Sequence, residues 1–162
     1  MLKKILYVLL IVFIVIQFFH PDKNINTGAS AIANDISRAF PVPNNVQTIL
    51  QTSCYDCHSN NTDYPWYAEV QPVEWWLNDH VEEGKRELNF NEFASYTLGR
   101  QYKKFSEIIK ETKEDEMPLS SFTLIHRDAL LSKDQKLVLA AWATAAMDSM
   151  KARYPADSLK RK

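Results

Sequence analysis

The sequence predicts an all-α protein with one folded domain and an N-terminal appendage. Only three of the 162 residues are glycine, whereas leucine, alanine, lysine and glutamate are frequent, and this composition favours helices. Apolar residues recur at spacings of three and four in the second half of the chain, which is the period of a helix with one buried face. The length suits one domain plus an appendage. The formal net charge of -1 gives no indication of a nucleic-acid partner.

Residues 1–20 are predicted to be a membrane anchor or an export signal. Residues 5–19 read ILYVLLIVFIVIQFF and follow Lys3 and Lys4, the pattern of a positive start before an apolar run. We expect an uncleaved transmembrane helix, because the small-x-small site at residues 29–31 lies far beyond the apolar run. A removed signal peptide is the alternative. Either reading places the rest of the chain outside the cytoplasm, on the inner membrane facing the periplasm or free in the periplasm.

Prolines and polar residues divide the remainder of the chain. Residues 21–40 are polar and are predicted to be a linker, and Pro41 and Pro43 mark the start of the folded domain. We place that domain at residues 41–150. Residues 151–162 are then a basic tail.

The most informative stretch is Cys54-Tyr55-Asp56-Cys57-His58, because it matches C-x-x-C-H, the attachment site of c-type haem. Two thiols at this spacing can form thioethers along one haem edge, and the histidine can be the proximal iron ligand. Both cysteines of the chain lie in this motif. A thioredoxin-like pair would need a βαβ context, and a zinc site would need a second pair of ligands. The motif therefore predicts haem c, with Cys54, Cys57 and His58 as binding residues.

Helices are predicted on both sides of the motif. One begins at Asn44 or Asn45 and runs into Cys54, and another begins at Pro72 and ends near Gly84. A capping box at Asn89 and Glu92 predicts a long helix to about Lys113, and a second box at Ser132 and Gln135 begins the last helix. We expect the last helix to cross another one closely, and the candidate for that crossing is the helix that carries Cys54.

Three aromatic residues after the motif, Tyr67, Trp75 and Trp76, are candidates for the wall of the haem pocket, with ordinary core packing as the alternative. His80 lies among charged residues and is predicted to face solvent. For the second ring nitrogen of His58, the Nδ1–H, we expect a carbonyl partner at Pro65 or Pro72.

Met117 is the predicted sixth ligand of the iron. Its thioether is a soft donor suited to haem, and Pro118 stiffens the loop that presents it. Of the other methionines, Met1 starts the chain, and Met147 and Met150 lie late on a helix. His126 is the rival distal ligand, and ordinary core packing of Met117 is the other alternative.

The arrangement resembles the haem-binding domain family of small bacterial c-type cytochromes over about residues 40–150. The resemblance is carried by these segments: 46–50, 53–60 with the motif, 64–67 (YPWY), 72–76 (PVEWW), 88–90 (LNF), 117–118 (MP) and 124–126 (LIH). It implies a cytochrome c-like helical domain around a covalent haem c, an extracytoplasmic location and a redox role. The long insertion between His58 and Met117 departs from ordinary cytochromes c and leaves the distal side open to question.

Three functions fit these observations. An electron carrier with a His58/Met117-ligated haem would pass electrons between redox partners whose identity the sequence does not give. A haem-based sensor or ligand-binding module would instead leave the distal position open. A small peroxidase would also need a polar acid/base such as His126 beside the iron. Ligation by Met117 favours the electron carrier, so we expect an electron-transfer protein and not an enzyme.

Overall fold

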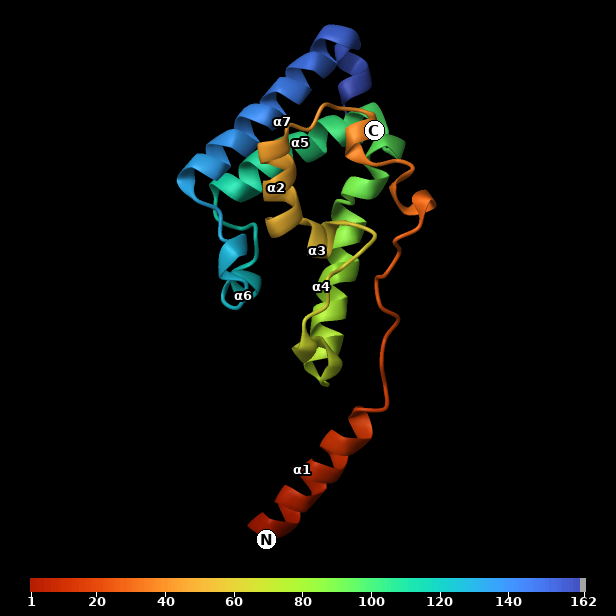
Figure 1. The fold of residues 1–162 in the computed structure, drawn as a ribbon, viewed down its shortest axis with the longest axis vertical. Helices are drawn as coiled ribbons and strands as arrows, with labels where there is room; N and C mark the ends of the chain where they lie inside the picture. Colours follow the sequence, from red (N-terminus) through yellow and green to blue (C-terminus); the bar gives the residue numbers. More distant parts are fainter. Residues whose placement is uncertain (161–162) are drawn as a thin grey trace.

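A computed structural model describes residues 1–160 of the chain, and these residues form helices joined by loops (Figure 1). The α-helices are α1 (Leu2–Ile16), α2 (Asn44–Ser53), α3 (Tyr55–His58), α4 (Val73–Glu87), α5 (Leu98–Lys113), α6 (Ser120–Thr123) and α7 (Lys133–Arg153). Short 3₁₀ helices are η1 (Ala29–Ile32), η2 (Ile36–Arg38), η3 (Trp66–Glu69), η4 (Phe90–Ser95), η5 (Arg127–Ala129) and η6 (Ala156–Leu159). Within residues 1–160, pairing of β type is limited to an isolated bridge between Ile25 and Asn61. The predicted all-α class is confirmed.

The hydrophobic core lies where α5 and α7 pack against each other and against α2. An aromatic cluster fills its centre. The ring of Phe105 is 4.8 Å from that of Phe40, 5.0 Å from that of Phe93 and 5.5 Å from that of Trp142, measured between centroids. Edge-to-face contacts of this kind add to the free energy gained by burying the rings.

The start of α7 agrees with its prediction. The Ser132 side chain accepts the N–H of Gln135, and the Gln135 side chain accepts the N–H of Ser132, which is a complete capping box. The helix packs chiefly on α5 and also contacts α2. The expected contact between the last helix and the helix before Cys54 is therefore present, but it is less extensive than the contact between α7 and α5.

The single helix predicted from Asn89 to Lys113 is wrong. Asn89 does cap a helix, but that helix is η4, and the Asn89 side chain accepts the N–H of Asn91. Tyr96 then adopts an extended conformation, and Thr97 caps α5 by accepting the N–H of Arg100. The Thr97 hydroxyl can cap a helix N-terminus, so a second helix begins here. The spacing of the apolar residues alone did not predict this break.

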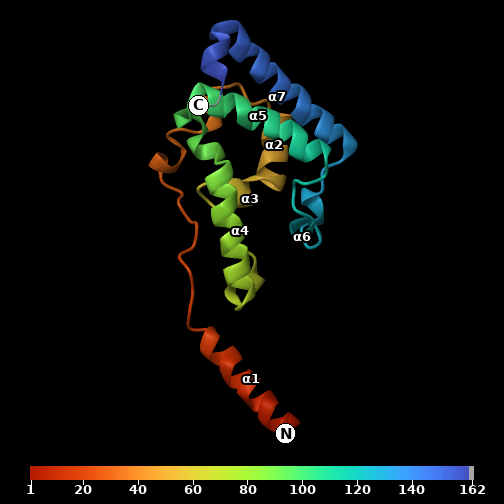
Figure 2. The same cartoon turned by 180° about the vertical axis from the view of Figure 1, so that it is seen from behind.

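Helix α1 projects from one end of the molecule (Figures 1 and 2). Its apolar side chains are exposed along most of its length. It has 15 residues. Among residues 1–160, no helix combines the length and the apolar character needed to cross a membrane. The predicted transmembrane helix at the N-terminus is thus not confirmed.

Residues 21–40 are not the separate linker that their polarity predicted. Ala31, Ile36 and Phe40 are buried, and Ile36 and Phe40 belong to the main core. At the other end, α7 continues past residue 150 to Arg153, and Leu159 of η6 packs against the core. Part of the predicted basic tail is therefore ordered on the domain, while residues 161–162 of that tail lie outside the described residues.

Candidate functional site

The C-x-x-C-H stretch forms one helical turn. Helix α2 ends at Ser53, and Cys54 separates it from α3 with φ of -130°. The Cys54 carbonyl accepts the N–H groups of Cys57 and His58, at 3.2 and 2.9 Å. Residues three and four apart in a helical turn lie on the same side. The turn therefore brings Cys54, Cys57 and His58 to one site.

Gly84 allows α4 to lie directly against this turn. A Cβ atom at Gly84 would be 2.6 Å from the carbonyl oxygen of Cys57 and 3.2 Å from its Cβ. Real Cβ atoms do not approach that closely, so a larger side chain would push α4 away from the motif. The absence of a side chain at Gly84 thus sets the position of the motif on the fold.

Helix α4 also fixes the ring of His58. Its Nδ1 atom lies 2.9 Å from the carbonyl oxygen of Gly84 and 2.9 Å from that of Leu88. A carbonyl only accepts hydrogen bonds, so Nδ1 carries the hydrogen and Nε2 has its lone pair free for a metal. The carbonyl partner expected at Pro65 or Pro72 is thus wrong, because the end of α4 is packed over the ring instead.

Burial lowers the pKa of His58, while the hydrogen bonds to the Leu88 and Gly84 carbonyls act in the opposite direction. The imidazole is consequently neutral near pH 7, which is the form that binds iron. The residue is only half-buried as a whole because part of its ring faces a cavity.

Two adjoining cavities, of about 290 and 340 Å³, lie beside the motif. Their combined size falls in the range of cofactor sites, roughly 300–1,000 Å³. Six residues line both cavities: Ser53, Cys54, His58, Glu87, Met117 and Pro118. The structure therefore brings the predicted proximal and distal ligands, His58 and Met117, to the same space.

The first cavity has an apolar wall and one charged edge. Its apolar residues are Leu50, Leu88, Phe90, Ile108, Leu131 and Leu139. At the charged edge, Lys104 is 7% exposed, and its Nζ contacts Glu107 at 2.6 Å and Glu87 at 3.3 Å. Glu111 also lines this edge, so the carboxylates outnumber the cation there, and it is the apolar wall that suits a flat apolar group.

The loop that carries Met117 is anchored to the last turns of α5. The N–H groups of Glu116 and Met117 both donate to the carbonyl of Glu111, at 3.0 and 3.1 Å. Asp115 allows the chain to turn back at the end of α5. Its φ of 62° is a left-handed conformation that aspartate adopts more readily than most residues. Met117 is half-buried at the cavities, so ordinary core packing does not describe its place.

The two thiols are held in their protonated form. Burial raises the pKa of Cys54 to about 12 and that of Cys57 to about 11. Each residue is nevertheless only half-buried, since part of its surface faces the cavities. Neither cysteine forms a disulfide.

The three predicted aromatic residues do not share one place. Tyr67 and Trp76 line a third, apolar cavity of about 320 Å³ that also touches Cys57. Trp75 lines none of these three cavities and donates its indole N–H to the carbonyl of Phe19, at 2.8 Å. It points to a different side of α4 from Trp76 because neighbouring residues on a helix are about 100° apart.

Two histidines differ from their predicted surroundings. His126 lines none of the three cavities, and its Nε2 lies 2.6 Å from the hydroxyl of Tyr67 while its ring stacks on Phe122. It would have to reorient to reach iron. His80, predicted to face solvent, lines the second and third cavities and bonds the Trp76 carbonyl through Nδ1.

The residues present fit a covalently bound haem. Two unpaired cysteines, an imidazole with Nε2 free and a thioether surround the same cavities, and a cationic side chain stands at the edge of one of them. Gly84, Leu88 and Lys104 complete the site but were not predicted. A glycine within a helical pattern was a usable signal for close packing, whereas nothing in the sequence marks a main-chain carbonyl.

Comparison with known proteins supports the cofactor. No curated protein sequence and no solved structure was found to match the chain. The model of one protein family, the haem-binding domain, matches residues 11–145. This range includes the motif, both cavities and the Met117 loop. The chain therefore belongs to the haem-binding domain family.

Proposed function

We propose that this haem-binding protein is an extracytoplasmic monohaem c-type cytochrome that carries electrons between redox partners. The observation that supports this most directly is the pairing of His58 and Met117 at the same cavities, with Nδ1 of His58 committed to main-chain carbonyls. Iron that keeps both axial ligands in its two oxidation states reorganises little, which favours electron transfer.

Each residue has a separate role in this proposal. Cys54 and Cys57 form the thioethers, His58 is the proximal ligand, and Met117 is the distal ligand. When bound, haem c supplies a one-electron couple. The carbonyls of Gly84 and Leu88 hold the imidazole in one tautomer and one orientation and make it a better donor. The apolar wall keeps water from the iron and so favours the reduced state.

The extracytoplasmic location rests on the N-terminal segment. Lys3 and Lys4 precede an apolar run whose side chains are exposed in α1, which is the pattern of an export signal. Attachment of c-type haem outside the bacterial cytoplasm agrees with that reading.

An optical spectrum tests the proposal. The chain is produced in a host that matures c-type cytochromes, and spectra are recorded for the ferric and ferrous forms with and without carbon monoxide. We expect a pyridine haemochrome of haem c, a ferric band typical of methionine ligation and no response to carbon monoxide. The Cys54→Ala/Cys57→Ala variant is expected to lose covalent haem.

The same spectra distinguish the competing functions. A five-coordinate iron that binds carbon monoxide would reject the ligation by Met117 and would favour a sensor or a peroxidase. His126 gives no support to peroxidase chemistry in this structure. It lines none of the three cavities, and its Nε2 contacts the Tyr67 hydroxyl.

A further inference from the structure

The exposed tryptophans gather on one small part of the fold. Of the four tryptophans, Trp142 is buried in the core, whereas Trp66, Trp75 and Trp76 are 81%, 40% and 49% exposed. All three lie on η3 and on the first turn of α4. We define the aromatic tip by the exposed apolar residues of this part of the chain: Trp66, Val70, Val73, Trp75 and Trp76.

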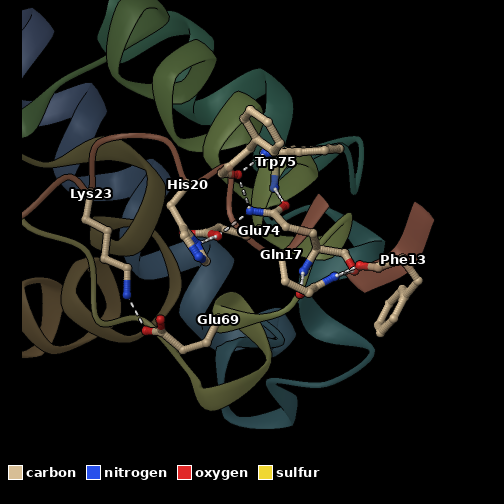
Figure 3. Close-up of polar contacts among 9 residues, drawn as sticks. Phe13, Gln17, His20, Lys23, Glu69, Glu74 and Trp75 are labelled. Atoms are coloured by element: carbon tan, nitrogen blue, oxygen red, sulfur yellow. Dashed lines mark hydrogen bonds and ion pairs between the residues drawn. The ribbon is translucent and has the colours of Figure 1, made fainter. Parts of the chain in front are cut away.

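The aromatic tip is hydrogen-bonded to the segment that leaves α1 (Figure 3). The Gln71 N–H donates to the side chain of Gln17 at 2.9 Å, and the Gln17 amide donates to the Gln71 carbonyl at 3.2 Å. The Phe19 carbonyl accepts from Trp75 at 2.8 Å and from the Gln71 side chain at 2.9 Å. Gln71 is fully buried, so the three bonds that it makes to this segment are shielded from competition by water more than the exposed bond between Trp75 and Phe19.

A hydrogen bond and an ion pair hold the next residues of the same segment. The Nδ1 atom of His20 lies 2.5 Å from Glu74, whose side chain is 3% exposed, and Lys23 pairs with Glu69 (Figure 3). The direction in which α1 leaves the domain is thus fixed by contacts on η3 and α4.

The apolar surface of α1 continues that of the tip. Phe18 and Phe19, at the junction, are 78% and 62% exposed. Both views show α1 extending from the end of the molecule where η3 and the start of α4 lie, away from α5 and α7 (Figures 1 and 2). Exposed apolar residues of α1, of the junction and of the tip therefore lie at the same end of the molecule.

The surface of α4 becomes acidic within two turns. The first exposed residues after Trp76 are Asp79, Glu82 and Glu83, and Arg86 and Glu87 follow in the last turn. At 1.5 Å per residue, Asp79 lies about 9 Å along the axis from Val73. Segments that lie in a bilayer interface bury their apolar side to a depth of about 5–10 Å, which matches the apolar part of α4.

We propose that the aromatic tip and α1 rest together in the interface of a lipid bilayer and hold the haem domain at the membrane surface. Tryptophan is enriched at this depth because its ring is apolar and its N–H is polar. Lipid fits better than a protein partner because the tip is hydrogen-bonded to the segment that follows the exposed apolar α1. The inference does not depend on which residue is the distal ligand of the iron, but Trp66, Val73 and Trp76 of the tip also line the third cavity.

Photolabelling from the lipid side tests this inference directly. The full chain with its haem is placed in nanodiscs of phosphatidylcholine and phosphatidylglycerol that contain a phosphatidylcholine with a diazirine near the glycerol end of one acyl chain. After irradiation, labelled peptides are mapped by mass spectrometry. We expect adducts on α1 and on the peptides of the tip. Exposed Leu137 and Tyr154 on the far side of the domain are expected to be unlabelled. Labelling confined to α1 would overturn the inference.

A pair of double variants provides a second measurement. Trp66→Ser/Trp76→Ser is expected to speed transfer of the full chain between vesicles roughly tenfold or more, from the apolar area that it removes. Leu130→Ser/Leu137→Ser removes exposed apolar residues elsewhere and is expected to leave the rate unchanged. An unchanged rate in the tryptophan variant, with an unlabelled tip, would assign the tip to another occupant such as a second copy of the chain.

The two proposals can fail separately. A six-coordinate haem c in a chain whose tip is not labelled would reject only the lipid contact. A labelled tip in a chain with five-coordinate iron would reject only the His58/Met117 electron carrier.

Discussion

The Nδ1 atom of His58 lies 2.9 Å from the carbonyl oxygen of Gly84, and the same glycine packs against the backbone of Cys57. One residue of α4 therefore both orients the proximal imidazole and sets the distance between α4 and the motif.

Replacing Gly84 with alanine is expected to destabilise the protein. Alanine favours a helix by about 1 kcal/mol over glycine, but its Cβ would lie 2.6 Å from the Cys57 carbonyl, and overpacking costs about 1–3 kcal/mol. The clash with rigid backbone should prevail and lower the midpoint of thermal unfolding. Gly28→Ala is the control, since a Cβ there meets only side-chain atoms at 3.5 and 3.6 Å. Equal stability of the two variants would contradict the close packing.

Met117→Ala is expected to open the distal side of the iron. The variant should bind carbon monoxide and lose the ferric band of methionine ligation. Axial ligands set haem potentials over a range of about 0.8 V, so we expect the midpoint potential to fall by on the order of 0.1 V. Met147, which is half-buried on α7, provides the control variant Met147→Ala. A spectrum unaffected by Met117→Ala would show that another group binds the iron.

Lys104→Gln is expected to lower the reduction potential by tens of millivolts, because a positive charge beside the cavity disfavours the ferric state. It should also cost up to about 1 kcal/mol of stability, since the exposed Glu87 loses its ion-pair partner and Glu107 keeps only Lys103. Redox titration and thermal unfolding measure the two effects. Lys103 also contacts Glu107 but is 41% exposed by its side chain and does not line the cavity. Lys103→Gln should leave the potential nearly unchanged, and equal shifts in both variants would refute a local effect of Lys104.

The thiols of the haem-free folded chain are expected to react slowly with iodoacetamide at pH 8. Their pKa values of about 12 and about 11 leave less thiolate at this pH than an ordinary cysteine has. The rate should rise about tenfold per pH unit up to the pKa of each thiol. The chain is produced in a host that does not attach haem, and alkylation of the purified protein is followed by mass spectrometry. The same chain in urea is the reference. Equal rates in buffer and in urea at pH 8 would show that burial does not protect the thiols.

The helical class and the place of the site followed from the sequence because both depend on local patterns. The capping box at Ser132 and Gln135 and the helix before Cys54 are short-range features, and they were predicted near their observed bounds. The family match agrees with the haem expected from the motif, while covalent attachment and ligation by Met117 remain proposals.

The errors arose where tertiary contacts decide the outcome. Residues 21–40 look like a linker by composition, yet Ile36 and Phe40 find room in the core. Trp75 and Trp76 are adjacent in sequence, but the helix turns them to different surroundings. The carbonyls that bind His58 carry no side-chain signature, and a prediction from residue types could not identify them.

The two acceptors that hold His58 belong to the main chain, at Gly84 and just beyond the last turn of α4. Replacing the side chain of Leu88 would leave its carbonyl in place, so substitutions at that position can retain the hydrogen bond to His58. Insertions or deletions near the end of α4 are different, because one added residue would rotate both carbonyls away from the ring. The proximal side of this protein should accordingly tolerate many substitutions in α4 but few changes in its length.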